Sequence, residues 1–324
     1  MQSAFDYIQE QIALFRWNKE PKGLYEPIGY ALSAGGKRLR PALAVIASDL
    51  YDGSREEVLP AALALEVFHN FTLLHDDVMD HAQIRRGKPC VHVKWDTNTA
   101  ILSGDEMLIE AYRLLSRVRE DKLPKVLQLF NKMATEICEG QQYDVDYEHL
   151  TEVTRDDYLN MIRLKTSVLL GTALQIGSYI AGATDAEQNA LYDYGVNIGL
   201  AFQLQDDILD VYGNPETFGK AIGGDILEGK KTYMLLTALL QADAAEKKEL
   251  QQLLAATPTN DAEKQAKIAA VTRLYDKLQV REEAENAMQR FTQIALDDLQ
   301  KISVSAERKL ILINLAKQLL ARKE

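Results

Sequence analysis

Two nearly identical acidic pentads, Asp76–Asp80 and Asp206–Asp210, constrain this chain more than any other feature, because each directly follows a largely apolar run. Burying a carboxylate without a partner is costly, so aspartates seldom stand in such runs without a compensating cation. The first and last aspartates of each pentad are four positions apart, which places them one turn apart on one face of a helix. The pentads therefore predict two facing helices that bind divalent metal together with phosphate oxygens of a ligand.

Basic residues and glycines accompany both pentads. The sequence Arg85-Arg86-Gly87-Lys88 follows the first pentad, and Gly35-Gly36-Lys37-Arg38-Leu39-Arg40-Pro41 precedes it, where glycine can end one helix and proline can open the next. Lys220, Lys230 and Lys231 follow the second pentad in a glycine-rich stretch. Cations and backbone N–H groups at a helix start bind anions. The pattern suits two polyphosphate groups bridged by metal.

The composition excludes several classes of partner. The formal charge of the 324 residues is −11, which argues against nucleic acid or an anionic membrane as the main partner. The two cysteines, Cys90 and Cys138, have no metal-binding spacing and indicate a reducing compartment. Residues 1–15 lack the pattern of a signal peptide. We therefore expect a cytoplasmic protein.

One uncharged segment, Thr166–Thr184, approaches the length of a membrane span. It contains hydroxyl side chains, a glutamine and three interleaved glycines, which favour a buried central helix instead. We expect no membrane span.

Helical periodicity dominates the rest of the chain, and strand signals are scarce. The apolar helical runs cover residues 59–79, 125–143, 159–180 and 192–211. The last eighty or so residues alternate charged and apolar positions as in a solvated outer layer. No linker divides the chain, so we predict one all-α domain over residues 1–324.

These motifs resemble, in order, the signatures of the trans-isoprenyl diphosphate (polyprenyl) synthases. Leu74–Asp80 with Arg85-Arg86 is similar to the first aspartate-rich motif of that family, and Phe202–Asp210 is similar to the second. The remaining matches are Gly35–Pro41, Lys165-Thr166, Gly219-Lys220 and Gly229–Thr232. The resemblance implies an all-α helical bundle around a central cavity. It also implies condensation of isopentenyl diphosphate with an allylic diphosphate, with release of pyrophosphate.

The resemblance also implies roles for individual residues. Mg²⁺, three ions per active site and replaceable by Mn²⁺, would be bound first by Asp76, Asp80 and Asp206, with Asp77, Asp207 and Asp210 as further ligands or in the outer sphere. Isopentenyl diphosphate would be bound by Lys37, Arg40, His69 and Arg86. The allylic diphosphate would be contacted by Arg85, Lys165, Thr166, Gln203, Lys220 and Lys230. Of these, Lys165, Thr166 and Gln203 would act in catalysis with Asp76 and Asp206.

The length of the product is expected to be short. Phe71 lies five residues before Asp76, where a growing chain anchored by its diphosphate would meet it, and Thr72 beside it leaves some space. We favour a C20 product over C15 on this ground. Phe71 as an ordinary core residue is the alternative.

Other functions remain open at this stage. They are a longer-chain polyprenyl diphosphate synthase, a class I terpene cyclase and a non-catalytic subunit of a heteromeric prenyltransferase. A homodimer is implied by the resemblance alone. The sequence leaves the roles of some polar residues undecided: Gln141, Asp144, Asp225, Arg322 and Lys323.

Overall fold

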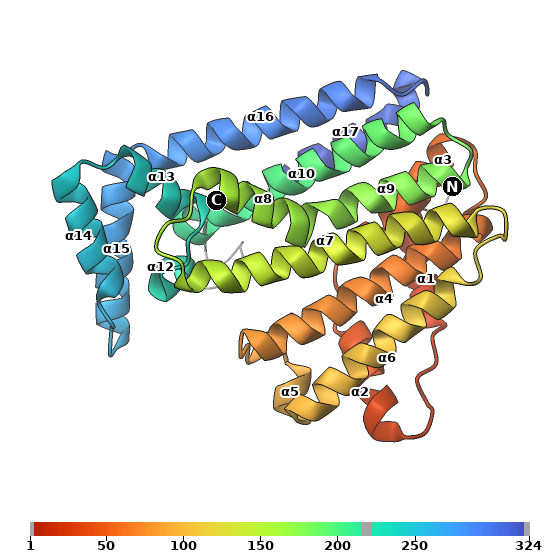
Figure 1. The fold of residues 1–324 in the computed structure, drawn as a ribbon, viewed down its shortest axis with the longest axis horizontal. Coiled ribbons are helices and arrows are strands. Elements are labelled where there is room, and N and C mark those ends of the chain that lie inside the picture. The colour runs from red at the N-terminus through yellow and green to blue at the C-terminus, as the bar shows by residue number, and fades with distance from the viewer. Residues whose placement is uncertain (1–2, 215–221, 321–324) are drawn as a thin grey trace. The chain divides into compact units, whose positions relative to one another are not determined.

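The computed structural model describes residues 3–214 and 222–320, and its secondary structure is almost entirely helical (Figure 1). The exception among these residues is one hairpin of two short strands. The predicted all-α class is therefore confirmed.

Contacts divide the chain into two compact units, each made of two stretches. The first unit comprises Met1–Lys132 and Thr172–Tyr192, and the second comprises Met133–Gly171 and Asp193–Glu324. The helices that run from one unit into the other are α7 (Leu123–His149), α9 (Val168–Ile180) and α10 (Asp185–Tyr212). The single domain and its central cavity stay predictions.

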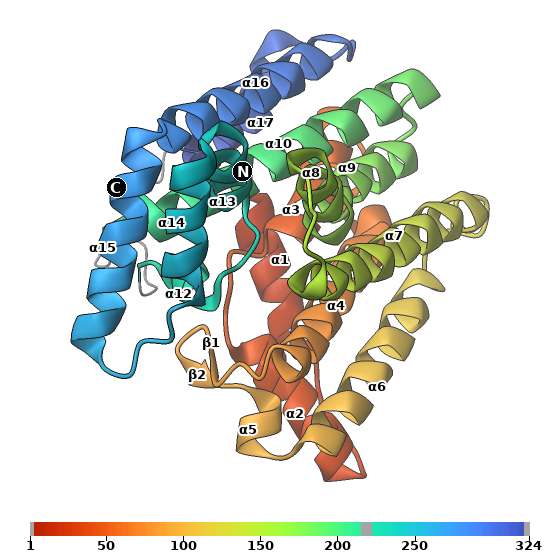
Figure 2. The same cartoon turned by 60° about the vertical axis from the view of Figure 1, so that its left-hand side comes forward.

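The first unit is built around α4, which packs against α3 and α6 (Figures 1 and 2). The elements that lie wholly within this unit are α1 (Ala4–Ala13), α2 (Lys22–Ser33), α3 (Leu39–Leu50), α4 (Arg55–Met79), β1 (Ile84–Arg85), β2 (Lys88–Pro89), α5 (Val91–Lys94) and α6 (Thr97–Leu115). Gly104 allows α6 to approach α4 closely, because a Cβ atom there would lie 2.2 Å from Nε2 of His75. The buried side chains along α3 and α4 form the core of this unit.

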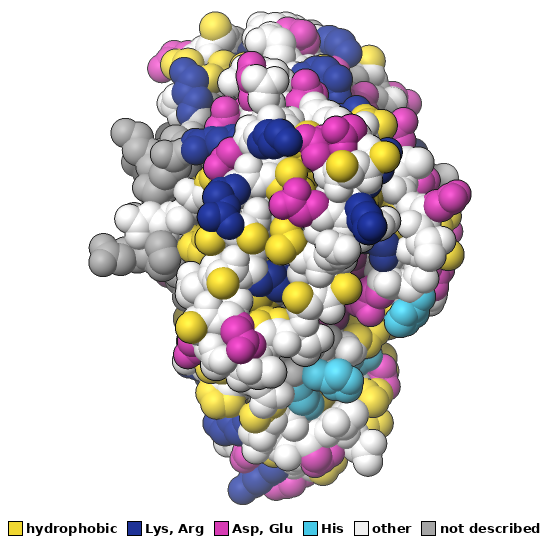
Figure 3. Space-filling view, turned by 90° about the vertical axis from the view of Figure 1, so that its left-hand side faces the viewer, with side chains coloured by type: hydrophobic (Ala, Val, Ile, Leu, Met, Phe, Trp, Pro, Cys, Tyr) yellow, Lys and Arg dark blue, Asp and Glu magenta, His cyan; other side chains and the backbone are white. Residues whose placement is uncertain are grey.

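The second unit holds the C-terminal helices. Besides parts of α7, α9 and α10, it contains α8 (Arg155–Ile162), the π-helix η1 (Arg163–Ser167), α12 (Gly224–Glu228), α13 (Tyr233–Gln241), α14 (Ala244–Ala255), α15 (Asp261–Lys277), α16 (Val280–Gln300) and α17 (Ala306–Leu320). Figure 3 shows acidic and basic side chains interspersed over the face that it presents, on the side where α14 and α15 lie in Figure 1. This mixture agrees with the predicted solvated outer layer.

The predicted helix over residues 159–180 is interrupted. A five-residue π-helix, η1, separates α8 from α9 and carries Lys165 and Thr166. Single π-turns inside helices often occur at functional sites. The π-helix packs closely against Gly140 of α7. A Cβ atom on Gly140 would lie only 2.3 Å from the backbone N of Lys165, so a residue with a side chain would not fit there.

Helix α4 is long and apolar enough to span a membrane by length and composition. However, 61% of its most apolar window is buried inside the protein, as in the central helix of a folded core. Helix α9, which falls within the uncharged segment considered above, is also almost wholly buried, as predicted.

Candidate active site

The first pentad lies at the C-terminal end of α4. Asp76 and Asp77 belong to the last turn, and Asp80 is the residue that caps the helix. The C-terminal end of a helix carries a partial negative charge, so carboxylates there are unfavourable unless cations are near. The position alone therefore demands positive charge around these aspartates.

Arg85 supplies part of that charge. Its Nη2 lies 2.6 Å from Oδ1 of Asp77, and its Nε donates a hydrogen bond to the same oxygen at 2.7 Å. The β1–β2 hairpin holds Arg85 in this place, because Arg86 and Gly87 form its two-residue turn with φ of 52° and 74°. Positive φ at both central positions is typical of the hairpin turn that matches strand twist. Asp77 is thus buried in an ion pair.

Arg86 and Arg40, unlike Arg85, have no carboxylate partner among the described residues. Within residues 3–214 and 222–320 neither guanidinium forms a salt bridge, and the buried Nε of Arg40 has no hydrogen-bond partner. Burial lowers the pKa of Arg40 to about 10, while Glu66 opposes the shift. Burial likewise lowers the pKa of Arg86, with Arg38 and Arg85 contributing. Arg40, which is half-buried, and Arg86, which is exposed, are thus crowded by other cations and form a ready site for an anion.

His69 lies on α4 two turns before Asp76 and is 8% exposed. Burial, followed by Arg40 and Arg86, lowers the pKa of His69 well below its ordinary value. The ring is therefore neutral at physiological pH and offers one donor and one acceptor. Lys37 lies exposed in the loop between α2 and α3. The predicted residues for isopentenyl diphosphate thus belong to one unit and to neighbouring elements in it.

The second pentad lies near the C-terminal end of α10, and its Asp207 forms no salt bridge with any residue that the structure describes. Its carboxylate accepts hydrogen bonds from the Tyr158 hydroxyl at 2.6 Å, the Gln203 amide at 3.3 Å and the Tyr233 N–H at 3.3 Å. Burial, and then the charge of Asp225, raises the pKa of Asp207 to about 7. The two pentads thus stabilise equivalent aspartates by different means.

Asp210 ties the following segment to α10. Its Oδ2 accepts a hydrogen bond from the backbone N–H of Asp225 at 3.1 Å, and its carbonyl accepts one from Gly223 at 2.6 Å. Asp225, which the sequence left undecided, therefore contacts the pentad through its backbone.

Lys165 forms an ion pair with Asp144 of α7, with Nζ and Oδ2 2.6 Å apart. Asp144 was one of the residues without an assigned role, and this contact explains it. Thr166 is half-buried beside Lys165, and Lys230 is exposed just before α13. Lys220, like Arg322 and Lys323, lies outside the described residues.

The neighbouring Lys231 has a clear structural role that the sequence did not indicate. Its Nζ donates hydrogen bonds to the carbonyls of Tyr147 at 2.6 Å and Glu148 at 3.1 Å, in the last turn of α7. Helix ends leave such carbonyls without intrahelical partners, so a lysine there is stabilising.

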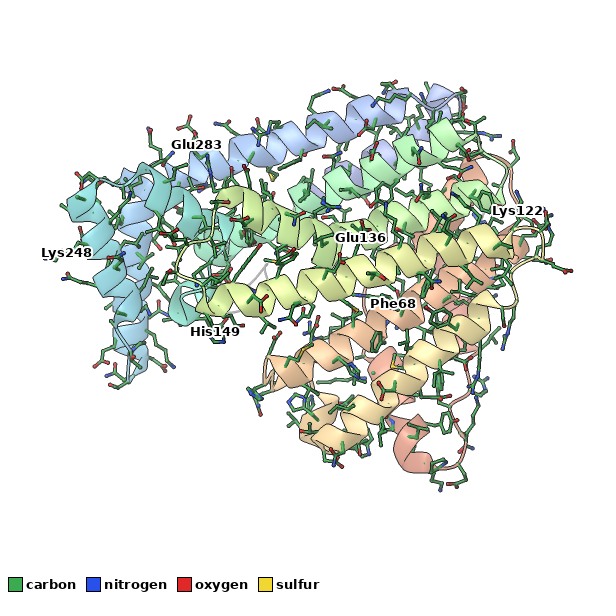
Figure 4. All side chains as sticks on the ribbon, viewed as in Figure 1. Phe68, Lys122, Glu136, His149, Lys248 and Glu283 are labelled. Carbon is green, nitrogen blue, oxygen red and sulfur yellow. The ribbon has the colours of Figure 1, made fainter. Side chains whose placement is uncertain are left out.

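Phe71 is half-buried on α4 in a column of aromatic rings. Its ring lies 4.8 Å from that of His75 and 5.5 Å from that of Phe68, which in turn contacts Phe130 of α7 at 5.2 Å. Figure 4 labels Phe68 in this column. The hydroxyl of Thr72 donates to the carbonyl of His69 at 2.8 Å.

No three acidic, histidine or cysteine side chains among the described residues converge into a protein-only metal site. The donor chemistry nevertheless fits Mg²⁺, which takes few protein carboxylates and completes its shell with water and phosphate oxygens. Asp76, Asp80, Asp206 and Asp210 are the less buried aspartates of the pentads, and Asp77 and Asp207 are the buried ones.

Comparisons with known proteins agree with this chemistry. The polyprenyl synthetase family model matches residues 21–271. The geranylgeranyl diphosphate synthase of Methanosarcina mazei is 46% identical over 220 residues, which are 67% of this chain and 68% of that protein.

Solved structures agree over nearly the whole chain. A crystal structure of a geranylgeranyl pyrophosphate synthase matches with a TM-score of 0.94 and 44% identity, covering 99% of this chain and 98% of that one. The enzyme of that kind from Corynebacterium glutamicum, complexed with calcium and isoprenyl diphosphate, matches with a TM-score of 0.82 and 30% identity, covering 99% and 96%. The chain therefore belongs to the polyprenyl synthetase family and is a prenyltransferase.

Proposed function

We propose that this enzyme condenses isopentenyl diphosphate with an allylic diphosphate to a short all-trans prenyl diphosphate, with C20 as the main product. The observation that carries the proposal is the cluster of cations around His69, in which Arg40 and Arg86 each have a lowered pKa because of desolvation and neighbouring positive charge. They form an anion site separate from the pentad carboxylates. A terpene cyclase binds one diphosphate and has no use for a second such site.

Isopentenyl diphosphate is bound by Lys37, Arg40, His69 and Arg86 in this proposal. The guanidinium groups of Arg40 and Arg86 gain an anionic partner, which relieves the repulsion between them. Neutral His69 donates a hydrogen bond without adding charge. Binding here leaves the double bond of the substrate free to react.

The allylic diphosphate is contacted by Arg85, Lys165, Thr166, Gln203, Lys220 and Lys230. Gln203 directs its amide N–H toward Asp207, which leaves its carbonyl oxygen to face developing positive charge. Lys165 exchanges part of its contact with Asp144 for the departing diphosphate. Each of these contacts strengthens as negative charge accumulates on the leaving group.

Asp76, Asp80, Asp206 and Asp210 would hold divalent metal, and Asp77 and Asp207 would support them from the outer sphere. Mg²⁺, for which we propose three ions per site, with Mn²⁺ as a substitute, neutralises diphosphate charge as a Lewis acid when bound. Burial differs among the carboxylates of each pentad. The less buried aspartates are therefore the proposed metal ligands, and the buried Asp77 and Asp207 hold the pentads in place.

In the reaction, the allylic C1–O bond breaks and its electron pair leaves with pyrophosphate. The double bond of isopentenyl diphosphate supplies the electrons for the new C–C bond, which leaves a tertiary cation. Loss of one proton, taken by the released pyrophosphate, restores a double bond. Thr166 and Gln203 stabilise positive charge with their oxygens, and no protein nucleophile takes part.

Product length is set by Phe71, with Thr72 leaving space for a C20 chain. The aromatic column supports this role, because Phe68 and His75 restrict the rotation of the Phe71 ring. We also place the protein in the cytoplasm, since its two cysteines are free.

A homodimer completes the proposal. Helix α6 exposes Ile101, Leu102, Ile109 and Tyr112, with 40–58% of each residue accessible. Apolar side chains gathered on one helix often mark an interface. A second copy of the same chain is the partner we propose for this face.

The purified chain should convert labelled isopentenyl diphosphate and an allylic primer only when Mg²⁺ or Mn²⁺ is added. Asp76→Ala and Asp206→Ala should each lower kcat by about 10³-fold or more, because several kcal/mol of Lewis-acid stabilisation corresponds to that factor. Asp261→Ala, which removes an exposed aspartate of α15, should have wild-type activity. Near-normal turnover in either pentad variant would contradict the metal assignment.

Asp207→Asn should stabilise the ligand-free protein at pH 8 and raise its Tm by a few degrees. The pKa of Asp207 is about 7 in the folded state, above its ordinary value, so the wild type loses stability as the pH rises from about 4 to 7. Asparagine cannot ionise and keeps an oxygen for Tyr158. Thermal melts at pH 4.5 and 8, without metal or substrate, would measure the difference.

The matched control is Asp77→Asn, at the equivalent position of the first pentad. It should lower the Tm instead, because Arg85 would lose its ionised partner. Equal effects of the two substitutions would show that the difference between the pentads has no energetic consequence.

Phe71→Ala should shift the products to longer chains while condensation continues, because the floor of the chain site is removed. Thr72→Phe should shift them toward C15. Chromatography of the dephosphorylated products resolves the lengths. The control is Phe291→Ala, a half-buried phenylalanine of α16. Unchanged lengths in the Phe71 variant would locate the floor elsewhere.

Light scattering should give a mass near twice 36.4 kDa for the wild type. Leu102→Glu should produce the monomer, because it places charge in the proposed interface. Leu240→Glu, at a side chain of α13 that is 63% exposed, should leave the mass unchanged. A monomeric wild type would refute the homodimer.

A further inference from the structure

The loop between α2 and α3 has a backbone that needs support. Gly35, Gly36 and Arg38 have φ of 84°, 121° and 49°. Glycine adopts such values without penalty, but a residue with a side chain does so only when its surroundings hold it there. Arg38 is also the N-cap residue of α3, so its conformation sets the direction of that helix.

Arg38 is held by two other helices. Its Nη1 lies 2.5 Å from Oε1 of Glu66 on α4, and its Nη2 donates to the carbonyl of Leu32 on α2. Only 4% of the Arg38 side chain and 3% of the Glu66 side chain are exposed. One guanidinium therefore joins the end of α2, the start of α3 and the middle of α4.

Glu66 is fixed in turn by Asn70, one turn further along α4. The amide of Asn70 donates to Oε1 of Glu66 at 2.9 Å and to the carbonyl of Glu66 at 2.8 Å. Glu66 is also the carboxylate that opposes the lowering of the pKa of Arg40 and Arg86. It is thus central to the cationic cluster without binding Arg40 directly.

Arg86 restrains the same loop from the side of the hairpin. It donates a hydrogen bond to the carbonyl of Gly35, and a Cβ atom on Gly36 would lie 2.7 Å from its guanidinium carbon. The loop is therefore held in place by Arg86 of the hairpin and by Arg38, which is paired with Glu66. Lys37 directly precedes Arg38 and Arg40 follows it by two residues. Both are proposed to bind isopentenyl diphosphate.

We propose that Arg38, Glu66 and Asn70 form a buried clamp that positions Lys37 and Arg40 to bind isopentenyl diphosphate. This inference rests on the proposed function of that site. The three residues are positioning residues, since they act through the loop and do not touch the substrate. Their loss should weaken the use of isopentenyl diphosphate and leave the use of the allylic substrate nearly unchanged.

Glu66→Gln tests the clamp with the least change in shape, because the amide keeps the acceptor and removes the charge. The KM for isopentenyl diphosphate should rise about tenfold, as expected when a hydrogen bond between two charged groups becomes one with a neutral acceptor. The KM for the allylic diphosphate should change less than twofold. If Glu66 were only a countercharge, its removal would strengthen diphosphate binding and lower the first KM, which would overturn the proposal.

The matched control is Asp49→Asn. It breaks the ion pair between Asp49 and Arg55, 2.7 Å apart, which joins α3 and α4 at the other end of α3. Both KM values should stay at the wild-type level. A rise in the KM for isopentenyl diphosphate equal to that of Glu66→Gln would mean that any loosening of α3 has this effect, and the clamp would be refuted.

A pair of further variants separates folding from positioning. Arg38→Gly permits the positive φ but leaves Glu66 without its cation, so the Tm should fall. Adding Glu66→Gln to it removes the unpaired charge, and the Tm should recover while the KM for isopentenyl diphosphate stays high. Recovery of the Tm and of the KM together would show a purely structural role and overturn the proposal.

Calorimetric titration of each protein with isopentenyl diphosphate, in the absence of an allylic substrate, gives a readout that is independent of turnover. Affinity should fall about tenfold in Glu66→Gln and remain unchanged in Asp49→Asn. If the wild type neither binds isopentenyl diphosphate nor condenses it, the proposed function itself fails. If the wild type binds it and Glu66→Gln binds it equally well, only the clamp fails.

Discussion

The ion pair between Asp77 and Arg85 is the interaction on which the first half of the site depends. It neutralises a carboxylate at the negative end of α4. The same contact holds the β1–β2 hairpin against the C-terminal end of α4. The hairpin then carries Arg86 to the loop after α2. One pair of opposite charges thereby brings three segments of the chain together, while Arg86 and Arg40 form no salt bridge within the described part of the chain.

The second pentad solves the same problem differently. Asp207 is surrounded by a hydroxyl, an amide and a backbone N–H, all of which are neutral donors. Neutral donors satisfy the oxygens of a carboxylate but do not cancel its charge, so its pKa remains raised. A cation that enters with a ligand would therefore be stabilised more strongly by Asp207 than by Asp77, whose charge Arg85 already neutralises.

Much of this could be predicted from the sequence, because the motifs are local. The helical class follows from periodicity, and the pentads and basic loops are each contained within a few residues. The helical run predicted over residues 159–180 contains a π-helix at Lys165 that the sequence did not indicate, since this π-helix packs closely on Gly140 of another helix. No local pattern signals that contact.

The residues that the sequence did not indicate are those that act over long separations. Tyr158 reaches Asp207 across 49 positions, and Lys231 reaches Tyr147 across 84. A tyrosine or lysine is unremarkable in a helical chain until its partner is known. Glu66 is similar: alone it is one acidic residue in an apolar run, and its contacts with Arg38 and Asn70 explain its burial.

In the motifs, one residue of an adjacent pair contacts the rest of the protein, and its neighbour is left to bind a ligand. Successive residues on a helix point about 100° apart, so two neighbours can have different surroundings. Asp77 is buried in an ion pair beside the less buried Asp76, and Asp207 is buried in hydrogen bonds beside the less buried Asp206. The lysine doublet follows the same division, since Lys231 binds the end of α7 while Lys230 is exposed.

This division explains why the motifs contain doublets of like charge, which would otherwise only repel each other. One member fixes the segment to the fold, and its own partner neutralises it or satisfies its hydrogen bonds. The other member is then held at a defined place by a short, rigid stretch of backbone, which lowers the entropy that must be lost when a ligand binds. A single charged residue on a mobile loop would offer the same charge without that orientation. The doublets are therefore a consequence of building a highly charged site on helices that must also be buried.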